Sequence, residues 1–433
     1  MKNSLIGTSA LVAASLLAGA AVAADAPAST SPLKLSVGGF GSAVVGYATQ
    51  DKKFLKAYGE EVSEIDVKGD NEIHFEGRAD LSNGLSVVAK YELEAGGNSS
   101  ADDHHVDNYS VSLGGGFGTL VAGVTDTALI AVANRAPHMG GRLFGEGISE
   151  GSLIGGSWVL NPLNTQSGNT KTFIEASAID SSYIHTGSAT ESISYMSPSI
   201  AGFTLGATYV PDSQQDAHDA SQPKGKGVSE AYGVAVAYEK SFGGVDVAAD
   251  IGWLKGGSKY SRKATQFDGI GSDFVTLAGG TNHTLRSRDR QEYQAGLNVS
   301  YSGVTVGGGY HLAKEKLGYD KDGATITLKE ETLGLKGSAW EAGVGYKTGP
   351  YGVALAYLSS NQGSLKSKTG VLASPYKTRA VQLTAEYTLS PGVMLVGGVG
   401  HVSFDGKKAD GKRLDDAFNN EGWVATTGLS LTF

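Results

Sequence analysis

The chain has 433 residues, a formal net charge of −9 and no cysteine. The negative charge and the lack of a basic stripe argue against a nucleic-acid partner, and the missing cysteines exclude a disulfide framework. Glycine is abundant, with 63 residues, but it lacks the three-residue period of collagen. Valine and aromatic residues are too frequent for a disordered chain, so the composition predicts a folded protein.

Residues 1–23 predict a secretory signal peptide. Lys2 supplies a short positive region, residues 5–17 are apolar and small, and Ala21-Val22-Ala23 forms a cleavage signal. The alternative, an N-terminal membrane anchor, would need about 20 apolar residues and a stop-transfer flank. We expect one mature domain over residues 24–433. It contains no stretch of 18 apolar residues, so any membrane insertion would use strands.

Residues 33–94, which follow a linker rich in Pro, Ala and Ser, predict the first strands. Residues 33–49 alternate between apolar and small or polar side chains, and residues 71–81 alternate more sharply. Asn83-Gly84 is a strong hairpin signal, because both residues accept positive φ at low cost. On residues 71–94 one face is apolar, and the other is mostly charged: Glu72, His74, Glu76, Arg78, Asp80, Lys90, Glu92 and Glu94.

The same alternation recurs along the rest of the chain. Several apolar faces carry Tyr or Trp at their ends, as in 232/238, 293/301, 340/346 and 351/357. A soluble amphipathic sheet also alternates, but it has no reason to place rings at both ends, whereas two membrane interfaces do. The further alternating segments are 109–113, 203–209, 232–238, 245–253, 293–301, 340–346, 351–357, 381–389 and 393–399.

The last segment, residues 421–433, fits a membrane strand best. Trp423 and Phe433 lie at the two ends of one apolar face, and the side chains of the opposite face are small and mostly polar. Because an open sheet edge cannot be left in lipid, the other strands must close the sheet.

Tight turns alternate with long polar loops, which predicts an all-β, transmembrane, antiparallel up-and-down β-barrel. We count about 16 strands, with both termini on the periplasmic side and the long loops outside. The tight turns are 82–84, 114–118, 198–202, 243–244, 303, 349–350 and 391–392.

These segments together resemble the Gram-negative general (diffusion) porins of the alpha- and betaproteobacterial type. The matching runs are LKLSVGGFGSAVVGYAT, NEIHFEGRADLSNGLSVVAKYELE, DNYSVSLGGGFGTLVAGVTDTALI and the terminal Phe433, which looks like the family's assembly signal. The resemblance covers essentially the whole mature chain. It implies a sixteen-stranded, usually trimeric barrel in the outer membrane, passive uptake of small hydrophilic solutes, and a constriction loop after the fifth strand.

The resemblance places the constriction loop at Thr127–Asp180 and the functional site in the lumen. Opposed acidic and basic walls would set up a transverse field that favours small polar solutes. Because the loop holds few acids for its size, strong cation selectivity is in doubt. Loop glycines are expected to let it lie against the wall. The expected pore-lining residues are His74, Glu76, Arg78, Lys90, Glu92, Asp126, Arg135, Arg142, Glu146 and Glu150.

Other motifs in the sequence give weaker evidence of function. Residues 102–105 with Asp107 could bind a divalent metal, but solvated loop charge explains them better, and we predict no metal site. The basic clusters 259–263, 286–290 and 407–413 are expected in outer loops. Their candidate partners are lipopolysaccharide phosphates beside the surrounding lipid, and solvated loop charge is an equal alternative. The sequence shows no catalytic spacing and no nucleotide fingerprint, so we expect neither an enzyme nor a cofactor.

Two other classes of function remain open. A channel selective for sugars would need aromatic residues on the lumen face, and one selective for phosphate would need a basic lumen. A barrel that anchors an enzyme or an adhesin would need a catalytic cluster at one rim or a separate passenger domain.

Overall fold

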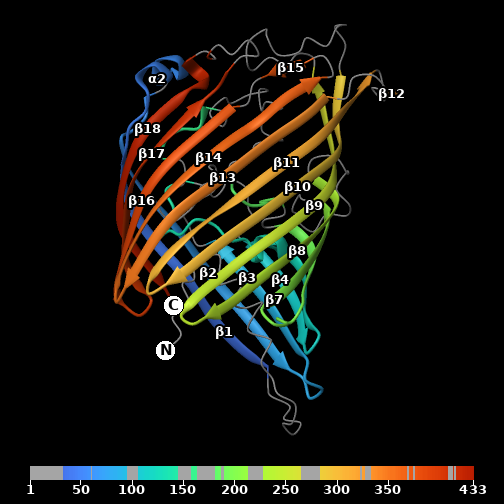
Figure 1. Ribbon diagram of the computed structural model, residues 1–433, viewed down its shortest axis with the longest axis vertical. Helices are drawn as coiled ribbons and strands as arrows, with labels where there is room; N and C mark the ends of the chain where they lie inside the picture. Colours follow the sequence, from blue (N-terminus) through green and yellow to red (C-terminus); the bar gives the residue numbers. More distant parts are fainter. Residues whose placement is uncertain are drawn as a thin grey trace.

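The computed structural model describes residues 33–59, 61–94, 106–144, 158–162, 181–186, 190–212, 228–264, 283–321, 324–326, 333–367, 370–373, 376–407, 413 and 416–433. The strands form one antiparallel sheet of 18, in which β1 also pairs with β18, so the sheet closes on itself as a tilted barrel (Figure 1).

Sixteen long strands form the wall, as the alternation predicted. The short strands β12 (Ala324–Ile326) and β15 (Gly370–Ala373) only extend two hairpins, because β11 pairs directly with β13 and β14 with β16. The wall consists of β1 (Lys34–Ala48), β2 (Ile65–Asp80), β3 (Ser86–Glu94), β4 (Val106–Gly115), β5 (Gly118–Thr125), β6 (Thr190–Met196), β7 (Phe203–Asp212), β8 (Val228–Phe242), β9 (Val245–Ala264), β10 (His283–Tyr301), β11 (Val304–Lys321), β13 (Leu333–Thr348), β14 (Tyr351–Ser367), β16 (Tyr376–Ser390), β17 (Val393–Asp405) and β18 (Asn420–Thr432).

The predicted tight turns are confirmed as short connections between neighbouring strands. At the β8–β9 turn, Gly243 and Gly244 have φ values of 58° and 93°, which glycine adopts without a steric penalty. These turns lie at the rim where the chain ends, and the long connections lie at the opposite rim (Figure 1). Short turns are periplasmic in bacterial outer-membrane barrels, and long loops are extracellular.

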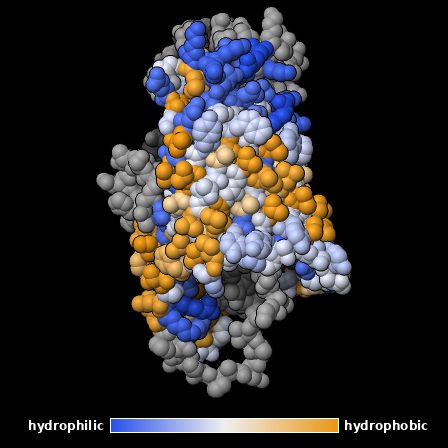
Figure 2. Space-filling view, turned by 90° about the vertical axis from the view of Figure 1, so that its left-hand side faces the viewer, coloured by the Kyte–Doolittle hydropathy of each residue, from blue (hydrophilic) through white to orange (hydrophobic). Residues whose placement is uncertain are grey.

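The apolar phase of each strand faces outward. Phe75, Leu205, Val306 and Leu355 are 43%, 56%, 57% and 48% exposed in the isolated chain. Figure 2 shows many of these side chains as an apolar band below a hydrophilic rim. Aromatic pairs such as Tyr351 and Tyr387, with ring centroids 4.9 Å apart, lie near the turn end of the band. The outer surface therefore matches a bilayer, as the alternation predicted.

Short helices lie in the connections at the loop rim. Helix α2 (Lys52–Tyr58) follows β1, is N-capped by Asp51, and contacts the 3₁₀ helix η2 (Asp416–Phe418). Its Phe54 is fully buried and stacks on Tyr58. In the described part of the chain, no helix is both long and apolar enough to cross a bilayer.

Candidate functional site

The long connection between β5 and β6 folds into the barrel. It runs from Asp126 to residue 189, some nine residues beyond the predicted end at Asp180, and the structure describes 126–144, 158–162 and 181–186 of it. It begins with the short helix α3 (Ala128–Ala131), which packs against β6, β7 and β8. The backbone N–H of Ala128 donates to Thr208 Oγ1 at 3.0 Å. The constriction loop that the resemblance implied is therefore present.

Beyond α3, lumen-facing side chains of β9 and β10 hold the loop backbone. Asp250 accepts from the Asn134 backbone N–H at 2.7 Å. Gln294 donates from Nε2 to the Leu129 carbonyl at 3.0 Å and to Asp250 Oδ2 at 2.9 Å. Asp250 and Gln294 are both about 4% exposed. Wall side chains thus satisfy the polar groups of a loop that is buried inside the barrel.

A buried ion pair holds the middle of the loop. Arg142 donates from Nη1 to Glu341 Oε2 on β13 at 2.7 Å, and both side chains are at most 2% exposed. Glu341 Oε1 accepts from the Ala136 backbone N–H at 2.9 Å, and Arg142 Nη2 donates to the Ala136 carbonyl at 2.5 Å. Glu341 therefore binds two points of the loop, which closes a compact turn between them.

Three alternate residues of β16 bind the next part of the loop. Thr384 Oγ1 accepts from the Met139 N–H at 3.0 Å, and Glu386 Oε2 accepts from the Gly140 N–H at 2.8 Å. Gln382 Oε1 accepts from the N–H groups of residues 143 and 144. Because alternate strand residues share one face, this run of β16 acts as a row of acceptors for the loop.

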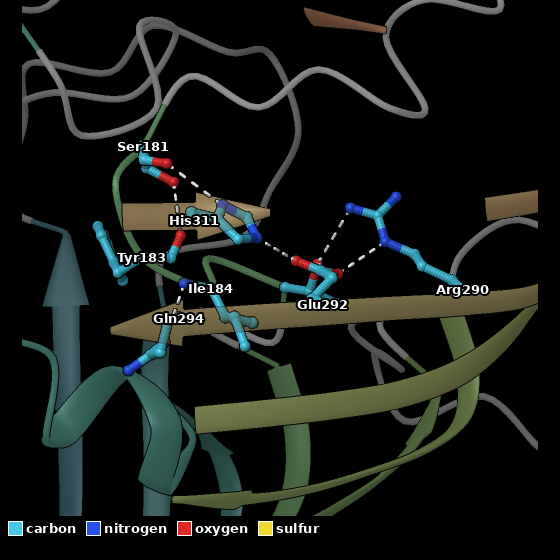
Figure 3. Close-up of polar contacts among 8 residues, drawn as sticks. Ser181, Tyr183, Ile184, Arg290, Glu292, Gln294 and His311 are labelled. Atoms are coloured by element: carbon cyan, nitrogen blue, oxygen red, sulfur yellow. Dashed lines mark hydrogen bonds and ion pairs between the residues drawn. The ribbon is translucent and has the colours of Figure 1, made fainter. Parts of the chain in front are cut away.

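The returning end of the loop is held by a buried network on β10 and β11 (Figure 3). Glu292, fully buried, bonds Arg290 Nε at 2.7 Å, His311 Nε2 at 2.8 Å and Thr186 Oγ1 at 2.5 Å. His311 Nδ1 also contacts the Ser181 carbonyl at 3.2 Å. One carboxylate therefore links two wall strands to the loop.

The loop also packs on apolar wall residues, which the predicted polar lumen face did not include. Leu143, Phe144, Trp158 and Val159 are at most 6% exposed. They form one buried cluster with inward-facing residues of β1, β14, β16, β17 and β18, among them Val44, Leu358, Ala380, Val402 and Val424. This part of the inner wall is thus a core beneath the loop rather than a water-filled surface.

Glycines of the wall make room for this contact. A Cβ on Gly46 of β1 would lie 2.4 Å from the Trp158 ring, and one on Gly296 of β10 would lie 2.3 Å from the Asn134 carbonyl oxygen. Both distances are shorter than atoms tolerate, so these positions need glycine. We expected loop glycines to make the fit, and the contribution of these wall glycines was not predicted.

The opposite side of the lumen, on β2–β5, holds a polar cavity. It includes five of the predicted pore-lining residues: Glu76, Arg78, Lys90, Glu92 and Asp126. Arg78 bonds Asp80 at 2.9 Å, and Lys90 forms an ion pair with Glu92. The other lining residues are Val88, Asn108, Tyr109, Ser110, Ser112, Val121, Thr125, Ala128, Ser194 and Met196.

The structure separates the remaining predicted residues. His74 lies next to this cavity and bonds Glu72 at 2.7 Å. Arg135 lies over the Tyr183 ring, 4.4 Å from its centroid. Arg142 corrects the prediction, because it is buried between loop and wall instead of lining the cavity. Glu146 and Glu150 lie outside the described residues.

Two of the three outer basic clusters are placed differently from the prediction. Residues 259–263 and 286–290 belong to β9 and β10 rather than to loops. Arg290 is 9% exposed and pairs with Glu292, so it is not an outer contact for lipopolysaccharide. In the third cluster, Lys407 and Arg413 are exposed, and residues 408–412 lie outside the described part. Residues 102–105 of the weak metal candidate also lie outside it.

Solved structures share this fold at low sequence identity. An anion-selective porin from Comamonas acidovorans matches with a TM-score of 0.54 and 16% identity, over 93% of this chain and 100% of that one. The outer-membrane protein OmpT of Vibrio cholerae, in its trimer form, matches with a TM-score of 0.54 and 13% identity, over 92% and 100%. The channel DcaP of Acinetobacter baumannii gives 0.51 and 14%, over 94% and 100%.

No curated protein sequence gives a significant match. A family model described as Gram-negative porin, however, matches residues 7–407. The family and the fold point to a channel rather than an enzyme. The chain belongs to the Gram-negative porins, and it is an outer-membrane channel for the passive diffusion of small hydrophilic solutes.

Proposed function

We propose that solutes cross this porin between the constriction loop and strands β2–β5, past Glu76, Arg78, Lys90 and Glu92. The observation that carries this path is the one-sided attachment of the loop. Residues 128–144 are bonded to β7, β9, β13 and β16, and the polar cavity lies on the other side.

The cavity favours a general channel over a substrate-selective one. Only one of its fifteen lining residues, Tyr109, is aromatic, whereas a sugar path would need several. Its two bases, Arg78 and Lys90, are both paired with carboxylates. A phosphate path would need bases that are available to the anion.

We also propose that the channel is a homotrimer whose seam lies around β1 and β18. Small residues on their outer face let another protein surface approach closely. Gly41 and Ala43 lie on β1, and Ala425 and Thr427 lie on the paired β18. Gly69 and Asn71 of β2 pair with Ala43 and Gly41 and extend the patch. The OmpT structure described as a trimer supports this proposal.

One preparation tests the trimer and the channel. The purified protein in detergent should have three times the protomer mass, and single insertions into a planar bilayer should give an ohmic current in three equal steps. A protein that is monomeric in detergent and still conducts would contradict the trimer but not the channel. A bilayer that stays impermeable to small ions after the protein is added would contradict the channel function.

A further inference from the structure

We infer that the open lumen of this porin selects for cations over anions, and that carboxylates at the loop end of β2 and β3 determine this selectivity. The inference rests on the proposed path along β2–β5. It concerns which solutes that path favours, and the resemblance to general porins does not decide this.

Each Lys or Arg on the lumen face of β2–β5 is paired with an acid two residues away on its own strand. Side chains at i and i+2 of a strand share one face, so such pairs form locally and leave no unpaired base to attract an anion. The pairs are Lys68 with Asp66 at 4.0 Å, Arg78 with Asp80 at 2.9 Å, and Lys90 with Glu92.

The same face carries further carboxylates. Asp70, Glu72, Glu76 and Glu94 form no ion pair with a Lys or Arg within the described residues. Since the bases are already paired, these four acids give the open wall an excess of negative charge.

Three of these acids converge. Ligand atoms of Asp70, Glu72 and Glu94 all lie within 4.8 Å of one another, and those of Glu72, His74 and Glu92 do the same. Like charges at this separation repel, and a cation between them lowers that repulsion. The two overlapping groups thus make the loop end of the path a region of strong negative potential.

A separate observation at Asn108 points the same way. Its amide nitrogen donates to Glu92 Oε2 at 2.7 Å and to Asp107 Oδ2 at 2.8 Å, which fixes the direction of the amide. The buried Oδ1 atom then has no hydrogen-bond partner among the described residues. An acceptor oxygen without a donor, next to carboxylates, suits a partly dehydrated cation and repels an anion.

Two arginines elsewhere in the lumen are also paired with acids. Arg142 is paired with Glu341 under the loop, and Arg290 with Glu292. Of the two arginines expected to line the pore, Arg142 is therefore buried and paired.

The test is the reversal potential of the reconstituted channel in a KCl gradient. We expect K⁺ to be more permeant than Cl⁻. In the double variant Glu72→Gln/Glu76→Gln, the permeability ratio should fall at least about threefold, because the variant removes two carboxylates from the wall of the path while keeping the shapes of their side chains. The matched control, Glu61→Gln/Glu64→Gln, removes two exposed charges outside the barrel wall and should change the ratio much less.

A wild-type current that prefers Cl⁻, or has no preference, overturns the inference and leaves the channel intact. A drop in the control equal to that in the lumen variant also overturns it. The sign of the wild-type reversal potential decides between cation and anion selectivity even if the variant fails to assemble. The absence of any current would overturn the proposed path itself.

Discussion

Replacing Arg142 with Met should lower the free energy of unfolding by about 3–5 kcal/mol, because it leaves the Glu341 carboxylate buried without its charge partner. Glu341 is 3% exposed, and its remaining described bond is to the Ala136 N–H. The loop should detach around residues 136–142, and single-channel recordings should become noisier. Denaturant unfolding in detergent measures the stability change.

An exposed ion pair supplies the control. Arg379 bonds Asp405 at 2.8 Å, almost the same distance as the buried pair, but the two side chains are 44% and 37% exposed. Arg379→Met should therefore cost at most about 1 kcal/mol. Equal losses in the two variants would contradict a buried anchor. The double variant Arg142→Met/Glu341→Gln should recover part of the loss, since it removes the unpaired charge.

Replacing Gly296 with Ala should push the constriction loop away from the wall and lower the single-channel conductance. The added Cβ would lie 2.3 Å from the Asn134 carbonyl oxygen and 2.4 Å from Asp250 Oδ1. Overpacking of this kind costs about 1–3 kcal/mol. The loop can relieve the clash only by moving toward the open side, where it narrows the path.

Gly77→Ala provides the matched substitution, because a Cβ there meets only Leu35 Cδ2, at 3.6 Å, on the outer face. It should leave the conductance unchanged. If Gly296→Ala conducts like the wild type, the loop does not rest on β10 in the conducting state.

Alternation predicted the wall because its period of two decides which face each side chain takes. A slip of one residue would turn Phe75 and Tyr91 into the lumen and Glu76 and Lys90 into lipid, so the register is strongly specified. The paired positions Phe75–Tyr91 and Glu76–Lys90 are those found in the structure. Repetition of this rule along the chain made the strand number predictable.

Whether a basic residue near the pore lines the cavity or is buried under the loop was not predictable in the same way. Arg78 and Arg142 look equivalent as bases near a pore, yet one lines the cavity and the other is buried at Glu341. What separates them is the path of the loop across the barrel, which depends on contacts between residues about 200 positions apart. No local pattern encodes such contacts.

One signal for the loop path was nevertheless present. Gly296, Gly343 and Gly345 interrupt strands on their lumen faces, and a glycine inside a strand often marks the close approach of another backbone. Their Cβ positions would meet Asn134, Ala136 and Pro137 of the loop. Mapping such glycines onto the lumen phase could have traced the loop. The signal peptide over residues 1–23 stays a prediction.

Water and solutes should pass along β2–β5, while the loop seals the opposite wall. The chain has no native cysteine, so single cysteines can report access to a charged thiol reagent. Ser110 lines the cavity, and Ser360, also on the lumen face, is fully buried. We expect the reagent to lower the conductance of the Ser110→Cys channel and to leave that of the Ser360→Cys channel unchanged. The reverse pattern would contradict this path.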